Sequence, residues 1–88
     1  MIFVSKAEKN REIVKMVEKR IKDLGYQGKL EFDPIPNTFK RRNHFTRKVD
    51  GTGVFTAFMW QMNSLSGDRL IMEIDSRISD AAEHFGLK

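Results

Sequence analysis

Eleven residues, from Phe39 to Val49, contain five Lys or Arg side chains and no acidic one. The other 77 residues hold 11 Lys or Arg and 12 Asp or Glu, so the formal charge of +4 arises in this basic tract. Positive charge at that density is stable only where solvent, salt or an anionic partner screens it. The tract also contains two phenylalanines, and cations beside aromatic rings are typical of surfaces that bind phosphates and stack bases.

A histidine within the basic tract suggests a second kind of chemistry. His44 lies close to Arg41, Arg42 and Arg47 in the sequence. A histidine can act as a general base on RNA while arginines stabilise the developing negative charge. The other histidine, His84, is expected to complement the dipole of a helix C-terminus. The chain has no cysteine and no acidic residues at metal-ligand spacing from either histidine, so we expect no metal site and no cofactor.

Two segments show the apolar periodicity of amphipathic helices. These helices would support the part of the fold that carries the basic tract. The first helix is predicted over residues 6–24, with Gly25 as its C-cap and an apolar stripe of Ile13, Val17, Ile21 and Leu24. The second is predicted from Asp68 onward, with a stripe of Leu70, Ile74, Ile78, Ala81 and Phe85. An alternative makes residues 69–75 a strand and starts a shorter helix at Ser76.

Three segments are typical of strands. Residues 28–33 alternate polar and apolar side chains, and residues 38–49 and 54–62 flank a Gly-rich hairpin loop at 50–53. Residues 2–4 could add a short N-terminal strand. The order α-β-β-β-α predicts an α+β fold: a single small domain over residues 1–88 with a three-stranded antiparallel sheet, two amphipathic helices and one open sheet face.

The register of the predicted hairpin decides which side chains share a face of the sheet. Pairing Val49 with Val54 places Phe45 opposite Phe58, and these rings would join Trp60 in the core. The other face would then be basic, with Phe55 exposed on it, although a slip of one residue would exchange the two faces. With two arginines at the strand edges, the predicted nucleic-acid-binding residues are Lys40, Arg41, Arg42, His44, Arg47, Lys48 and Phe55.

The expected function is regulatory, non-catalytic binding of nucleic acid, with RNA or single-stranded DNA ahead of duplex. Cations would neutralise phosphates, and Phe55 would stack a base for ~1–3 kcal/mol. One alternative is a protein-binding regulator or inhibitor of a larger complex, and another is a solvated edge strand that prevents aggregation. A third is RNA cleavage by His44. The open sheet face could also mediate a homodimer.

The predicted order of elements, together with the basic sheet, resembles double-stranded-RNA-binding domains and the HicA-type RNA-cleaving toxins built on that fold. The resemblance implies RNA as the ligand and, for the toxins, His44 as the catalytic residue. The local motifs differ from both groups. The second helix begins at Gly67-Asp68-Arg69 where RNA-binding domains carry a lysine cluster, and Asn43 precedes His44 where the toxins carry a Gly-Ser pair.

Length and composition set the broad class. The chain has 88 residues, of which 40% are hydrophobic and 32% charged, enough for one small core with a well-solvated surface. The longest apolar run is too short to span a bilayer, so no membrane partner is expected. A short N-terminal apolar run meets charged residues at once, unlike a signal peptide, which predicts a cytoplasmic location.

Overall fold

The computed structural model describes residues 6–34, 37–43, 45–46 and 48–87. The N-terminal strand considered for residues 2–4 lies outside these residues. The described part contains three antiparallel strands and three helices in the order α1-β1-β2-β3-α2-α3. The predicted α+β class is therefore confirmed, with an additional short helix, α2, between the sheet and the last helix.

The two long helices lie close to where the apolar periodicity predicts them. Helix α1 spans Lys6–Asp23, and Gly25 ends it with a φ of 87° while donating its amide to the Lys22 carbonyl over 3.0 Å. Helix α3 spans Gly67–His84 and buries Leu70, Ile74, Ile78 and Ala81. The strand alternative for residues 69–75 is therefore wrong. No helix in the described part of the chain is long and apolar enough to cross a lipid bilayer.

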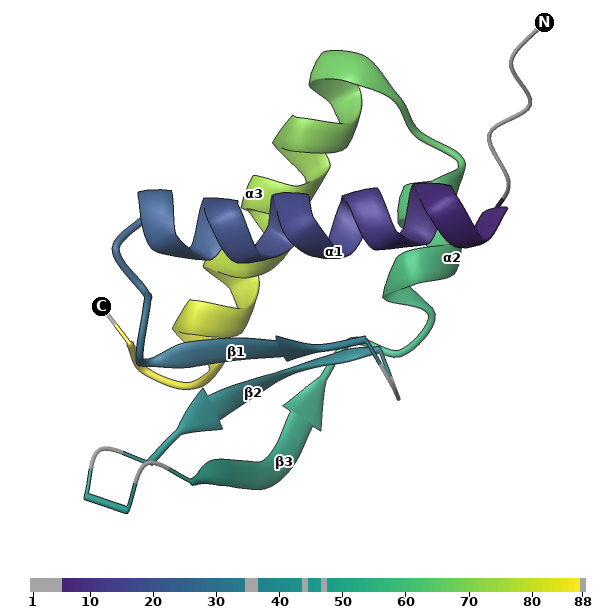
Figure 1. Cartoon of the computed structure of the whole chain (residues 1–88). Coiled ribbons are helices and arrows are strands. Elements are labelled where there is room, and N and C mark those ends of the chain that lie inside the picture. Colours follow the sequence, from purple (N-terminus) through teal and green to yellow (C-terminus); the bar gives the residue numbers. More distant parts are fainter. Residues whose placement is uncertain (1–5, 35–36, 44, 47, 88) are drawn as a thin grey trace, which may run out of the picture.

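The sheet carries its helices on one side. Strands β1 (Leu30–Asp33), β2 (Thr38–Arg42) and β3 (Val49–Val54) lie in that order, with β2 in the centre. Figure 1 shows α1 and α3 crossing over the sheet and the last turn of α3 reaching the start of β1. Helix α2 (Phe58–Asn63) lies toward the opposite end of β1. One sheet face is thus covered and the end beside the C-terminus of α3 is distinct from the end beside α2.

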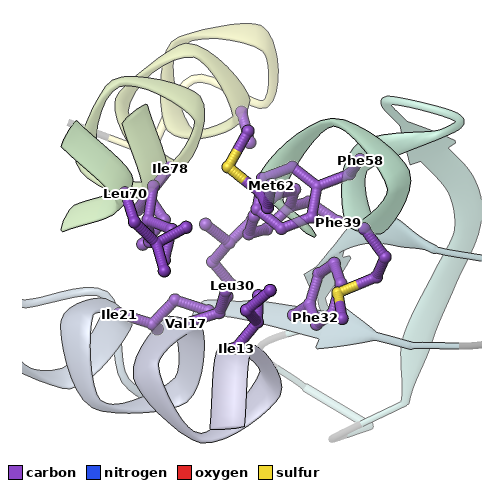
Figure 2. Close-up of a cluster of buried hydrophobic side chains, with 13 residues drawn as sticks. Ile13, Val17, Ile21, Leu30, Phe32, Phe39, Phe58, Met62, Leu70 and Ile78 are labelled. Atoms are coloured by element: carbon purple, nitrogen blue, oxygen red, sulfur yellow. The ribbon is translucent and has the colours of Figure 1, made fainter. Parts of the chain in front are cut away.

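A cluster of three phenylalanines joins the sheet to α2. Phe32 of β1, Phe39 of β2 and Phe58 of α2 are all buried, with ring centroids 5.0 to 5.3 Å apart. Tilted and edge-on contacts of this kind add about 0.5–1.5 kcal/mol each beyond the burial of apolar area. Figure 2 shows this cluster beside the side chains that the helices and β1 contribute, among them Ile13, Val17, Ile21, Leu30, Met62, Leu70 and Ile78.

The β2–β3 hairpin turns earlier in the chain than predicted. Strand β2 ends at Arg42 and β3 begins at Val49, so the turn lies in the basic tract and not at residues 50–53. Lys40 is paired with Gly53 and Arg42 with Val49, so two steps along β2 correspond to four along β3. The predicted register is therefore wrong. The two glycines of β3 suit such an irregularity, because glycine in a strand often marks a bulge.

The second half of the predicted strand 54–62 is helix α2. Phe58, Met59 and Met62 occupy positions i, i+1 and i+4, which form one face of a helix, and all three are buried. Trp60 lies on the other face and is 71% exposed, so its predicted place in the core is wrong. Aromatic and branched residues favour strands only where a pleated surface can bury them, and here helical burial prevails.

A residue with left-handed backbone, Ala57, lies between β3 and α2, and its substitution tests the turn that joins these two elements. Ala57 has a φ of 62° and an exposed side chain. The left-handed region costs an L-residue about 1–2 kcal/mol. We expect Ala57→Gly to raise the free energy of unfolding by relieving this backbone strain. The gain should not exceed about 1 kcal/mol, because glycine also gains entropy in the unfolded chain, which offsets part of the relief. Urea denaturation measures this, and a loss of stability like that of buried Ala82→Gly would contradict the described turn.

Gly53 allows β3 to approach β2 closely. A Cβ atom at this position would lie 2.8 Å from the Thr38 Cγ2 and closer still to its hydroxyl oxygen, which donates to the Val54 carbonyl over 2.7 Å. We expect Gly53→Ala to lower the free energy of unfolding by about 1–3 kcal/mol through this overlap. Thr38→Ala removes both crowded atoms. The double variant should therefore lose less stability than the two single variants summed, whereas strict additivity would contradict the contact.

A bidentate ion pair links the two long helices. Arg20 of α1 donates from Nε and Nη2 to the two carboxylate oxygens of Asp75 of α3, each over 2.7 Å. These hydrogen bonds raise the pKa of Arg20 above its ordinary value. Asp23 lies 3.4 Å from Arg20 and accepts from Lys19, and the Lys19 hydrogen bond lowers the pKa of Asp23. The crossing of α1 and α3 is thus fixed by polar contacts as well as by the core.

Candidate nucleic-acid interface

The described residues that connect β2 to β3 make hydrogen bonds to Asn43. The Asn43 amide donates to the Lys48 carbonyl over 2.6 Å, which continues the hairpin one step past Arg42. Its side-chain Oδ1 accepts from the backbone amides of Phe45 and Thr46 at 2.9 and 3.3 Å. Asparagine favours turns because its side chain can take the place of a backbone acceptor in this way. The backbone at Phe45 is therefore held by hydrogen bonds.

Phe45 projects from this turn instead of entering the core. Its side chain is 95% exposed, whereas Phe58, its predicted cross-strand partner, is fully buried. That pairing and the pairing of Val49 with Val54 are wrong, because the ladder places Arg42 opposite Val49. A large aromatic side chain left this exposed beside a cationic segment is suited to contact with a partner.

The basic side chains on the open sheet face have acidic neighbours. The Lys40 ammonium lies 3.2 Å from the Asp33 carboxylate, and the Arg42 guanidinium lies 3.1 Å from the Glu31 carboxylate. Both carboxylates belong to the neighbouring strand β1, where each lies diagonal to its basic partner, because Glu31 is opposite Lys40 and Asp33 is opposite Thr38. The predicted face of fixed cations without carboxylates is thus corrected to a face of mixed charge.

Phe55 does not lie on that open face. It is half-buried and packs edge-on against Phe39 with ring centroids 5.9 Å apart. The guanidinium carbon of Arg77, from α3, lies 5.6 Å from the centre of the same ring. The predicted face assignment is wrong for Phe55, whose contacts are with the core and with α3.

A cavity of about 440 Å³ opens at the end of the sheet where β1 begins, β2 ends and α3 ends. Two cations from β2 and one from the chain just before β1 surround it, and the Asn43 turn brings Phe45 to its wall. No Asp or Glu occurs among the described residues that line it. The described lining, which we call the β-end cavity, consists of Lys29, Arg41, Arg42, Asn43, Phe45, Gly86 and Leu87.

The β-end cavity brings together only part of the predicted site. Arg41 and Arg42 line it, whereas Lys40 lies in the middle of the sheet and Lys48 is exposed in the hairpin turn. His44 and Arg47 lie outside the described residues. Lys29 was missed, although the ladder explains its place: Leu30 is opposite Arg41, and the Arg42 amide donates to the Lys29 carbonyl over 2.8 Å. A correct register for β1 and β2 would have revealed it.

The described residues contain no group of three or more His, Asp or Glu side chains that could hold a metal ion.

No protein-family model matches the chain, and the comparisons with curated proteins and with solved structures find no match either. Because helix α2 lies between β3 and α3, the observed order of elements differs from the α-β-β-β-α order of the RNA-binding domains.

Proposed function

We propose that this protein binds single-stranded nucleic acid, either RNA or single-stranded DNA, at the β-end cavity and acts as a regulatory protein. The proposal is carried by one observation: three cations and an exposed aromatic ring surround a single cavity whose described lining has no carboxylate. Cationic grooves neutralise the phosphate backbone, and aromatic rings stack unpaired bases at ~1–3 kcal/mol per base.

The side chains divide into two roles in this proposal. Lys29, Arg41 and Arg42 bind phosphate, Lys29 as a point charge and each arginine as a planar fork that can donate two hydrogen bonds. Phe45, and not Phe55, takes the stacking role. Lys48, exposed in the same turn, extends the positive field along the strand of nucleic acid.

Fluorescence anisotropy with labelled single-stranded RNA, single-stranded DNA and duplex tests the proposal. We expect single strands to bind more tightly than duplex, with an affinity that falls steeply as salt rises. If the protein bound none of the three nucleic acids at low salt, the proposal would be overturned. A denaturing gel of the same samples reports on the nuclease alternative, for which metal-independent cleavage should disappear in His44→Ala while binding persists.

Removing the ion pair between Glu31 and Arg42 is predicted to tighten the binding of single-stranded RNA. Because the Glu31 carboxylate lies 3.1 Å from the Arg42 guanidinium, it competes with phosphate for that cation. We expect Glu31→Gln to raise the affinity for single-stranded RNA by a few-fold, about 0.5–1 kcal/mol for a partly exposed pair. Asp33→Asn is the matched control, since it removes the same charge beside Lys40, which does not line the cavity. Equal gains in both variants would contradict the local competition.

A second candidate function is the binding of a protein partner, as a regulator of a larger complex. The observation in its favour is the exposure of two large apolar side chains on the helices, Trp60 at 71% and Met72 at 69%. Aromatic residues are frequent anchors of protein interfaces. This candidate would gain support if the anisotropy titrations showed no nucleic-acid binding.

A further inference from the structure

We infer that the β-end cavity holds one unpaired nucleotide, with its phosphate at Lys29 and Arg41 and its base against Phe45. The inference rests on the proposed function and adds the size and chemistry of the ligand. A cavity of about 440 Å³ lies in the lower part of the range for small-molecule sites, about 300–1,000 Å³. That volume suits a single nucleotide and is too small for several stacked ones, so a nucleoside monophosphate should occupy it as well.

The phosphate end of the cavity is attached to the paired part of the sheet. Arg41 lies opposite Leu30 in the β1–β2 ladder, and the hydrogen bond from the Arg42 amide to the Lys29 carbonyl closes the same end. Leu30 is buried in the core. The backbone that carries both phosphate-binding cations is therefore fixed before a ligand arrives, which lowers the entropic cost of binding.

The base end combines an aromatic ring with an apolar wall. Phe45 is presented by the hydrogen-bonded Asn43 turn, and Leu87, which packs against the core after the end of α3, also lines the cavity. Stacking on Phe45 needs a base face that neighbouring base pairs cover in a duplex, so the nucleotide must be unpaired. Stacking is tolerant of base identity, so the four monophosphates should bind with affinities within a few-fold of one another.

The test uses the whole chain and three small probes: adenosine 5′-monophosphate, adenosine and inorganic phosphate. In amide-resolved NMR titrations we expect the monophosphate to shift Lys29, Arg41, Phe45 and Leu87, and each fragment to bind at least about tenfold more weakly. Phe45→Ala should weaken the monophosphate about tenfold, as loss of one stacked base predicts, and leave inorganic phosphate unaffected. Lys15→Gln, a change at an exposed cation of α1 outside the cavity, is the control and should alter neither.

The outcomes separate this inference from the proposed function. A single-stranded oligonucleotide that shifts the cavity amides while the monophosphate shifts none would overturn the single-nucleotide site and leave nucleic-acid binding intact. Equal affinities for the monophosphate and inorganic phosphate would overturn the role of Phe45. If neither the oligonucleotide nor the monophosphate shifts these amides, both proposals fail.

Discussion

Phe58→Ala is expected to lower the free energy of unfolding by about 3–5 kcal/mol, the usual cost of truncating a buried phenylalanine. Phe58 is fully buried and contacts Phe32 and Phe39 with ring centroids 5.2 and 5.3 Å away. Such a loss is comparable with the whole stability of many small domains. The variant should therefore be partly unfolded at room temperature, visible as an early transition in urea denaturation followed by circular dichroism.

Phe45→Ala is the matched control for this prediction, because it removes the same side chain from a position that is 95% exposed. Its free energy of unfolding should stay within about 0.5 kcal/mol of the parent value. In the hairpin predicted from sequence these two residues are cross-strand partners, and both truncations would then be costly. Similar losses in the two variants would favour that pairing and contradict the helical assignment of α2.

Replacing Lys29 and Arg41 together with glutamine is expected to weaken single-stranded RNA binding by about 100-fold. Each side chain is taken to make one charge-assisted contact with phosphate, at about 1.5 kcal/mol or tenfold in affinity. The slope of log affinity against log salt should also become shallower by ~1.4, at ~0.7 for each lost phosphate contact with a single strand. Anisotropy titrations at four or more salt concentrations give both quantities.

Two controls separate the cavity from net charge. Lys15→Gln removes a charge from the exposed face of α1, and Lys40→Gln removes one that lies beside Asp33 in the middle of the sheet. Neither residue lines the β-end cavity. Each control should change affinity much less than Arg41→Gln. A uniform loss per charge removed, at any of these positions, would mean that the protein attracts nucleic acid without a defined site.

The long helices could be predicted because their stripes are strictly periodic and their ends are marked. Leu70, Ile74 and Ile78 repeat every four residues and are buried together. Gly25 stands where α1 needs a left-handed residue, with a φ of 87°. Both signals are local, and the chain follows them because no tertiary contact opposes them.

The hairpin could not be predicted because its signals conflict. Gly51 and Gly53 resemble a turn, but they occupy β3, and the turn instead forms on Asn43. The segment from Phe55 to Met62 has the composition of a strand, yet its buried positions follow a helical spacing. Register depends on contacts between strands, which composition does not encode, and a wrong register reassigns every side chain of the hairpin to a different face.

The candidate site was only partly accessible from sequence for the same reason. The basic tract is visible as a run of charge, so Arg41 and Arg42 could be named. Lys29 lies in a separate segment and reaches the cavity only through the pairing of β1 with β2. Phe45 is exposed because the hairpin turns at Asn43 and not at residues 50–53. A charge pattern therefore located the region, and tertiary pairing selected the residues.

An amide-resolved NMR titration of the protein with a short single-stranded RNA tests the β-end cavity as the nucleic-acid site. We expect the largest shifts at the β-end cavity, on Lys29, Arg41, Phe45 and Leu87, and we expect them to diminish as salt is raised. Shifts centred on Trp60 and Met72, or no shifts at low salt, would contradict this expectation and direct the search toward a protein partner.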